Sequence, residues 1–86
     1  MQEIYIFVLE YLIHRQAWEL GFLSFYKFKK IISYATGIYN IYYIRKIFIH
    51  LNNRGFFQKK KNLKRSYMYK FIGEGRKDDF KKVNFN

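Results

Sequence analysis

The stretch SYATGIYNIYYIRKIFIHLNNRG, residues 33–55, decides the fold because it holds two helix stop signals with an apolar repeat between them. Gly37 suits the left-handed residue that closes a helix. The side chain of Asn40 can accept hydrogen bonds from the free backbone N–H groups at the start of the next helix. From Ile41 onward apolar residues recur every three or four positions, and Gly55 ends the pattern. The stretch therefore predicts a chain reversal around Gly37 and Asn40, followed by a helix.

A second apolar repeat precedes this stretch. Residues 3–34 contain no proline, and Gly21 is their only glycine. Their apolar spacing of three and four is typical of an amphipathic helix, in which Gly21 would mark a bend or a close approach. Ile, Tyr and Phe also favour strands, so residues 38–49 could be β structure, but their spacing is not two. Because short connections favour antiparallel neighbouring helices, the sequence predicts an all-α fold built on an antiparallel two-helix hairpin.

Positive charge is concentrated after this hairpin. The 86 residues include 17 Lys+Arg and 6 Asp+Glu, for a formal net charge of +11, and residues 51–86 carry eleven of the basic and three of the acidic side chains. We expect residues 1–55 to form the hairpin and residues 56–86 a basic, largely extended tail that a partner orders. Such a tail indicates a polyanion, either nucleic acid or an anionic membrane surface. Aromatic residues among the lysines favour nucleic acid over the alternative of a solvated tail.

The sequence lacks the patterns that mark catalytic, metal or phosphate-loop sites. His14 and His50 have no cysteine or carboxylate set around them. Ala-Thr-Gly at residues 35–37 lacks the lysine and the earlier glycine of a phosphate-binding loop. The apolar run of residues 4–13 is half as long as the roughly 20 residues that a membrane span needs. We therefore expect no enzyme activity, no cofactor, no metal, no small-molecule substrate and no transmembrane span.

The residues of the turn resemble a ribosomal protein family. In the L-twenty-nine family of the large subunit, a long first helix ends in an Ala-Thr-Gly or Ala-Ser-Gly turn, and the second helix opens with an Ile-Arg pair. Over residues 15–53 the matching positions are Phe28, Ala35, Thr36, Gly37, Asn40, Ile44, Arg45, Ile47 and Leu51. The pattern departs at Ile41, where the family often has proline, and at Phe48 and Ile49, where it has a basic pair. Residues 29–39 also resemble a turn of the small-subunit S-thirteen family, which ranks second.

The resemblance implies a structural ribosomal protein that binds rRNA near the peptide exit tunnel of the large subunit, beside the L-twenty-three protein. Ile, Lys, Asn, Phe and Tyr supply more than half of the chain, which suggests an AT-rich genome such as an organellar one. Since the first residues do not look like a presequence, we expect a mitochondrial, organelle-encoded protein. The alternatives are a small-subunit ribosomal protein and a supernumerary subunit of an inner-membrane respiratory complex.

Lys and Arg neutralise RNA phosphates, so the expected RNA-binding residues are Lys27, Lys29, Lys30, Arg45, Lys46, Arg54, Lys59, Lys60, Lys61, Lys64, Arg65 and Lys70.

Overall fold

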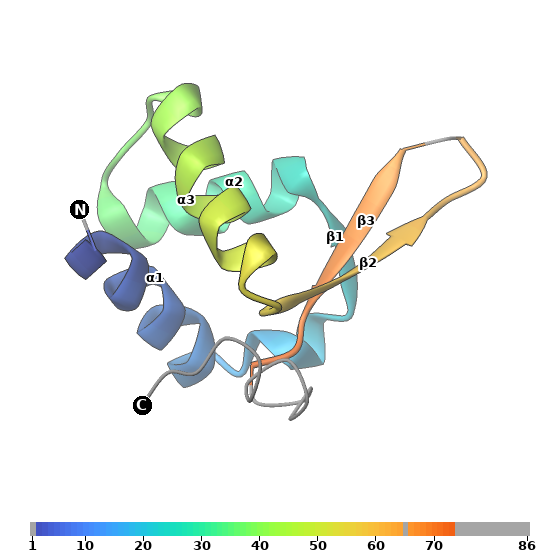
Figure 1. Ribbon diagram of the computed structural model, residues 1–86, viewed down its shortest axis with the longest axis horizontal. Helices are drawn as coiled ribbons and strands as arrows, with labels where there is room; N and C mark the ends of the chain where they lie inside the picture. Colours follow the sequence, from blue (N-terminus) through green and yellow to red (C-terminus); the bar gives the residue numbers. More distant parts are fainter. Residues whose placement is uncertain (1, 65, 74–86) are drawn as a thin grey trace.

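The computed structural model describes residues 2–64 and 66–73 and has a mixed α/β fold (Figure 1). In chain order its elements are helix α1 (Gln2–His14), the 3-10 helix η1 (Ala17–Leu20), strand β1 (Phe22–Ser24), helices α2 (Phe25–Thr36) and α3 (Ile41–Asn53), and strands β2 (Phe57–Lys61) and β3 (Tyr67–Phe71). The strands form one antiparallel sheet in the order β1-β3-β2. The predicted all-α fold is therefore wrong, because the described residues combine α-helices with a three-stranded sheet.

The single long helix expected over residues 3–34 is interrupted at two backbone positions. Gln16 has φ 51° and ψ 49°, which is left-handed, and ends the run that α1 began. Gly21 has φ 73° and ψ −151°, a combination that only glycine adopts readily. Helix α2 then begins at Phe25, and Ser24 caps it, since its hydroxyl oxygen accepts a hydrogen bond from the backbone N–H of Lys27 at 3.3 Å. The apolar spacing continues across both breaks, so periodicity alone does not reveal them.

The turn between α2 and α3 confirms the predicted chain reversal. Gly37 has φ 75°, and its N–H donates to the carbonyl oxygen of Ser33 at 2.8 Å. Asn40 caps α3, since its Oδ1 accepts from the backbone N–H groups of Tyr42 at 2.9 Å and Tyr43 at 3.3 Å.

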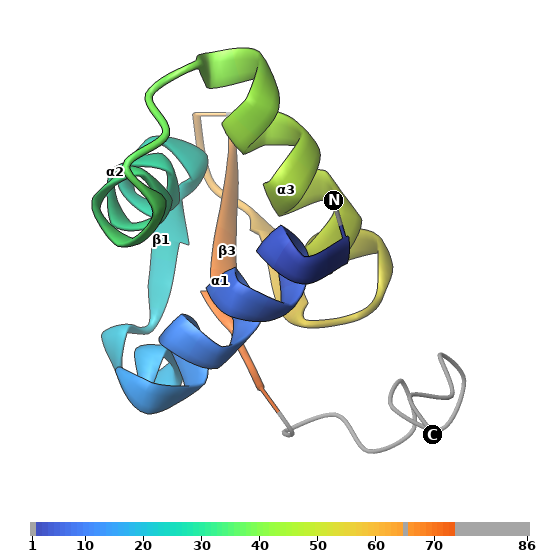
Figure 2. The ribbon, with the colours of Figure 1, turned by 90° about the vertical axis from the view of Figure 1, so that its left-hand side faces the viewer.

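The two helices joined by this turn do not form the predicted antiparallel hairpin. Figures 1 and 2 show α3 crossing α2 steeply. The reason is that both apolar stripes face other elements as well as each other: α2 and α3 each contact α1, α2 also contacts β3, and α3 also contacts β2. Two crossing helices joined by a short glycine-containing turn form a helix–turn–helix.

The predicted tail begins with a β-hairpin that completes the core. Phe57 of β2 lies opposite Phe71 of β3 in the register, and both side chains are buried together with Phe56. Strand β3 lies in the centre of the sheet because β1 pairs with its other edge. Strand β2 carries lysine at three consecutive positions after its first two residues, so it lacks the apolar alternation that predicts a half-buried strand.

One core joins the helices to the hairpin. Phe48 of α3 lies at its centre, with its ring centroid 4.6 Å from that of Phe57, 4.8 Å from that of Tyr69 and 5.9 Å from that of Phe28. The buried apolar residues are Val8, Leu12, Ala17, Phe28, Ile32, Ile44, Ile47, Phe48, Leu51, Phe56, Phe57 and Phe71. Among the described residues, no helix is both long enough and apolar enough to cross a bilayer.

Replacing Gly37 by valine should lower the free energy of unfolding by about 1–3 kcal/mol, because a β-branched residue resists positive φ. A Cβ at this position meets nothing within 4 Å, so the loss comes from the backbone and not from a clash. Gly37→Asn is the matched control, since asparagine visits the left-handed region more easily. Urea unfolding followed by circular dichroism measures both variants. Equal midpoints for Gly37→Val and Gly37→Asn would contradict the role given to the turn.

Candidate nucleic-acid interface

Helix α3 has one buried side and one exposed side. Ile44, Ile47, Phe48 and Leu51 are buried in the core. The opposite side, which we call the outer face of α3, consists of Tyr42, Arg45, Lys46, Ile49 and Asn53, all of them exposed. Tyr42 keeps 80% of its surface exposed and Ile49 keeps 46%. The outer face therefore combines two cations, a hydroxyl, an amide and an aliphatic group.

Arg45 holds a defined position on this face. Its guanidinium carbon lies 5.3 Å from the ring centroid of Phe25, the first residue of α2. Phe25 in turn packs edge-on against Phe48, with centroids 5.1 Å apart. Phe48 also contacts Tyr69 of β3. These contacts place the Arg45 cation where α2, α3 and the hairpin meet.

We call the hairpin of β2, β3 and the connecting residues 62–66 the wing. Side chains alternate along a strand, so Lys59 and Lys61 lie on the same side of the sheet as the buried Phe57, toward the helices. The Nζ of Lys59 lies 4.5 Å from the ring centroid of Tyr67 across the hairpin. The wing therefore presents cations on the side that adjoins α3.

The other side of the wing is cationic too. The Nζ atoms of Lys60 and Lys70 lie 4.7 and 6.0 Å from the ring centroid of Phe22 in β1. Lys64 is exposed near the tip, and Arg65 lies outside the described residues. Of the predicted residues, Arg45 and Lys46 thus lie on α3, Lys59 and Lys61 on the side of the wing toward the helices, and Lys60 and Lys70 on its opposite side.

The other predicted residues lie elsewhere. Lys27 is exposed near the start of α2. The Nζ atoms of Lys29 and Lys30 lie 5.3 and 4.9 Å from the ring centroid of Tyr26. Lys30 also lines a shallow groove between α1 and α2, together with Arg15. These three lysines of α2 do not belong to the outer face of α3.

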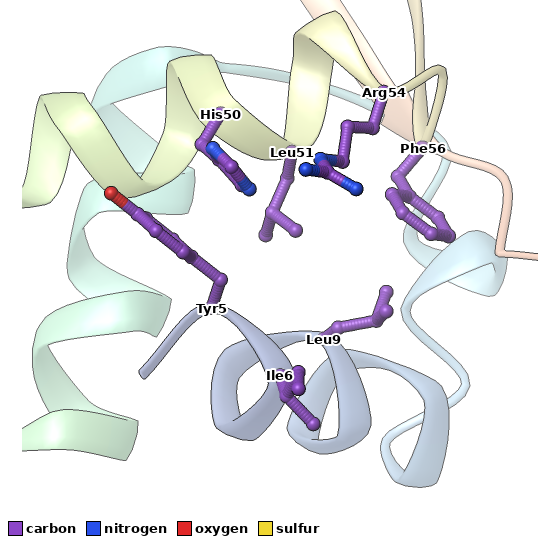
Figure 3. Close-up of a pocket in the computed structure, with 7 residues that line it drawn as sticks. All are labelled: Tyr5, Ile6, Leu9, His50, Leu51, Arg54 and Phe56. Carbon is purple, nitrogen blue, oxygen red and sulfur yellow. The ribbon is translucent and has the colours of Figure 1, made fainter. Parts of the chain in front are cut away.

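Arg54 faces a hollow of about 160 Å³ between α1 and the end of α3 (Figure 3). Across this hollow the ring of Tyr5 stacks on His50, with centroids 3.8 Å apart and planes 12° apart. Burial, and then the nearby Arg54 charge, lower the pKa of His50, which favours the neutral imidazole. The stack joins α1 to the inner side of α3. In the described part of the chain, no group of three or more His, Asp or Glu side chains could hold a metal ion.

Acidic residues are unevenly distributed along the sequence. The acidic residues all lie before residue 21 or after residue 73, namely Glu3, Glu10, Glu19, Glu74, Asp78 and Asp79. Residues 21–73, which include β1, the helix–turn–helix and the wing, carry no acidic side chain. Residues 21–73 themselves therefore offer a polyanion no repelling side-chain charge.

Sequence reasoning missed the uncharged members of the outer face, Tyr42, Ile49 and Asn53. A signal for them was present, because the helical period of 3.6 places these residues opposite the apolar stripe of α3. A search for cations that neutralise phosphates does not select them, because all three side chains are uncharged.

Comparison with protein-family models, with curated proteins and with solved structures found no match for this chain. What the site can do follows from its shape and charge. It offers an exposed helix face with hydrogen-bonding and apolar groups and a cationic arm, both within residues 21–73, which carry no acidic side chain. These are the features expected of a surface that binds nucleic acid.

Proposed function

We propose that this protein binds duplex DNA through a helix–turn–helix with a wing. Helix α3 would lie in the major groove, and the wing would contact the adjacent backbone. The observation that carries the proposal is the outer face of α3, where Tyr42, Arg45 and Lys46 are exposed on the second helix of a helix–turn–helix. In proteins with this motif the second helix is the one that enters the groove.

The dimensions of the groove favour DNA over RNA. An α-helix with its side chains is about 10–12 Å across, and the B-form major groove is about 12 Å wide. The major groove of A-form RNA is deep and too narrow for side chains to read. The ribosomal resemblance was built on an antiparallel hairpin, and this chain has crossing helices instead. A place on a mitochondrial ribosome remains an untested prediction, and binding to RNA is an outcome that the experiment below includes.

The chemistry of the outer face supports base contacts as well as phosphate contacts. Arg45 and Lys46 can donate to guanine or to phosphate, and Asn53 can pair with adenine. The exposed aliphatic side chain of Ile49 suits the methyl group of thymine. This combination provides direct readout in addition to non-specific charge attraction.

Selection from a random duplex library would supply the probe, and fluorescence anisotropy would measure its affinity. We expect the selected DNA duplex to bind at least tenfold tighter than an RNA duplex of the same sequence. Tyr42→Ala combined with Lys46→Ala should weaken DNA binding by tenfold or more, since each good base contact contributes about 1–3 kcal/mol. Lys30→Ala, in the groove beside α1, is the control and should weaken binding by less than threefold.

Tighter binding to the RNA duplex would overturn the proposal and support the ribosomal alternative. An equal loss for Lys30→Ala and for the α3 variant would show that α3 is not the reading helix.

A further inference from the structure

The tip of the wing carries an aliphatic side chain in full contact with solvent. Leu63 has a relative exposure of 103%, the highest of the large hydrophobic residues in the described part of the chain. Its near neighbours along the chain are the exposed cations Lys61 and Lys64. Figure 1 shows the wing reaching beyond the helices, so its tip has no part in the core.

Asn62 gives this tip a defined shape. Its Oδ1 accepts from the backbone N–H of Lys64 at 2.9 Å and from that of Ser66 at 3.2 Å. The backbone N–H of Asn62 donates to the carbonyl oxygen of Ser66 at 2.9 Å. These bonds close the turn on the polar side chain of Asn62 and leave Leu63 pointing away from the protein. Asn62 is thus a positioning residue for Leu63.

We propose that Leu63 inserts between stacked base pairs in the minor groove next to the site read by α3, and that it bends the duplex. The inference rests on the proposed function. Apolar side chains such as leucine act as wedges of this kind, and flanking cations hold the backbone while the step unstacks. Lys61 and Lys64 are placed to do so on either side of Leu63. A tip that only followed phosphates would gain nothing from a solvent-exposed leucine.

The reach of the wing agrees with this placement. Leu63 lies six positions after the buried Phe57, which corresponds to about 20 Å at about 3.3 Å per strand residue. A helical turn of DNA is about 34 Å, so the next minor groove lies roughly 17 Å along the axis from a major-groove site. The wing is anchored at its base, where the buried side chains of Phe57 and Phe71 lie edge-on to each other.

The test uses the selected duplex with 2-aminopurine at successive positions beside the α3 site and dyes at both ends. For the full chain, unstacking should raise 2-aminopurine fluorescence at one step, and energy transfer should report a bend. Leu63→Ala should abolish the fluorescence rise and reduce the bend, with a three- to tenfold loss of affinity. Leu63→Met, which keeps a large apolar side chain at the tip, should show both signals that Leu63→Ala lacks. Lys64→Gln is the control, and should weaken binding while keeping the fluorescence rise.

Two results would overturn the inference while leaving the proposed function intact. One is tight binding of the unmodified chain without a fluorescence rise at any step. The other is a rise that persists in Leu63→Ala. If the unmodified chain binds no duplex DNA at all, the proposed function fails and this inference fails with it. Circular dichroism should be the same for all variants, because Leu63 and Lys64 are exposed.

Discussion

Replacing Phe71 by alanine should lower the free energy of unfolding by about 3–5 kcal/mol, the usual cost of removing a buried phenylalanine. Phe71 is fully buried. Its ring lies edge-on to Phe57 with centroids 5.6 Å apart, and stacks on Trp18 of η1 with centroids 6.4 Å apart. A chain of 86 residues has a total stability of about 4–13 kcal/mol. The variant should therefore lose at least about a quarter of the total stability, and unfold at a clearly lower urea concentration than the unmodified chain.

Urea unfolding measured by tryptophan fluorescence and by circular dichroism would follow this loss in both the hairpin and the helices. Trp18 reports the neighbourhood of Phe71 directly, and the far-ultraviolet signal reports the helices. The matched control is Tyr67→Ala, on the same strand, where the side chain keeps 45% of its surface exposed. That change should cost less than about 1 kcal/mol. If Phe71→Ala unfolds at the urea concentration of the unmodified chain, the hairpin is a separate tail, as its sequence predicts.

The turn and helix α3 could be predicted because their signals are local. Gly37 and Asn40 act on backbone groups within four residues of themselves, and the apolar repeat of α3 lies within one element. The sheet could not be predicted in this way. Strand β1 pairs with β3, which lies far along the chain, and places Phe22 opposite Lys70. No local sequence pattern near either strand indicates this pairing. In β2 only Phe57 is buried, so the strand has no alternating pattern.

In the candidate site, too, features with local signals could be predicted and features that depend on long-range contacts could not. The cations of α3 and of the wing were identified from the sequence because charge is visible residue by residue. The packing of α2, α3 and the wing against one another could not be predicted, since it depends on the contacts of Phe48 with Phe25 and Tyr69. The residues behind the ribosomal resemblance, Ala35 to Gly37 and Asn40, are those that end one helix and cap the next. Such residues recur wherever two helices meet at a short turn, so they specify the turn and not the angle between the helices.

Changing the four wing lysines Lys59, Lys60, Lys61 and Lys64 to glutamine should flatten the salt dependence of DNA affinity. Each phosphate neutralised adds about 0.9 to the slope of log affinity against log salt for duplex DNA, so four contacts account for about 3.6. All four side chains are exposed, so glutamine should leave the fold intact. Arg45→Gln with Lys46→Gln removes only two charges and should flatten the slope by about 1.8 at most.

The two variants should also differ in specificity, because in the proposed complex the wing lysines contact the backbone while α3 faces the bases. The wing variant should lose affinity for the selected duplex and for a scrambled duplex by similar factors, since phosphate contacts carry no sequence information. The α3 variant should lose more affinity for the selected duplex than for the scrambled one. Anisotropy titrations of both duplexes at several salt concentrations measure slope and preference together. If the wing variant kept the original slope while the α3 variant lost it, the wing would be only a solvated arm and α3 would supply the whole electrostatic contact.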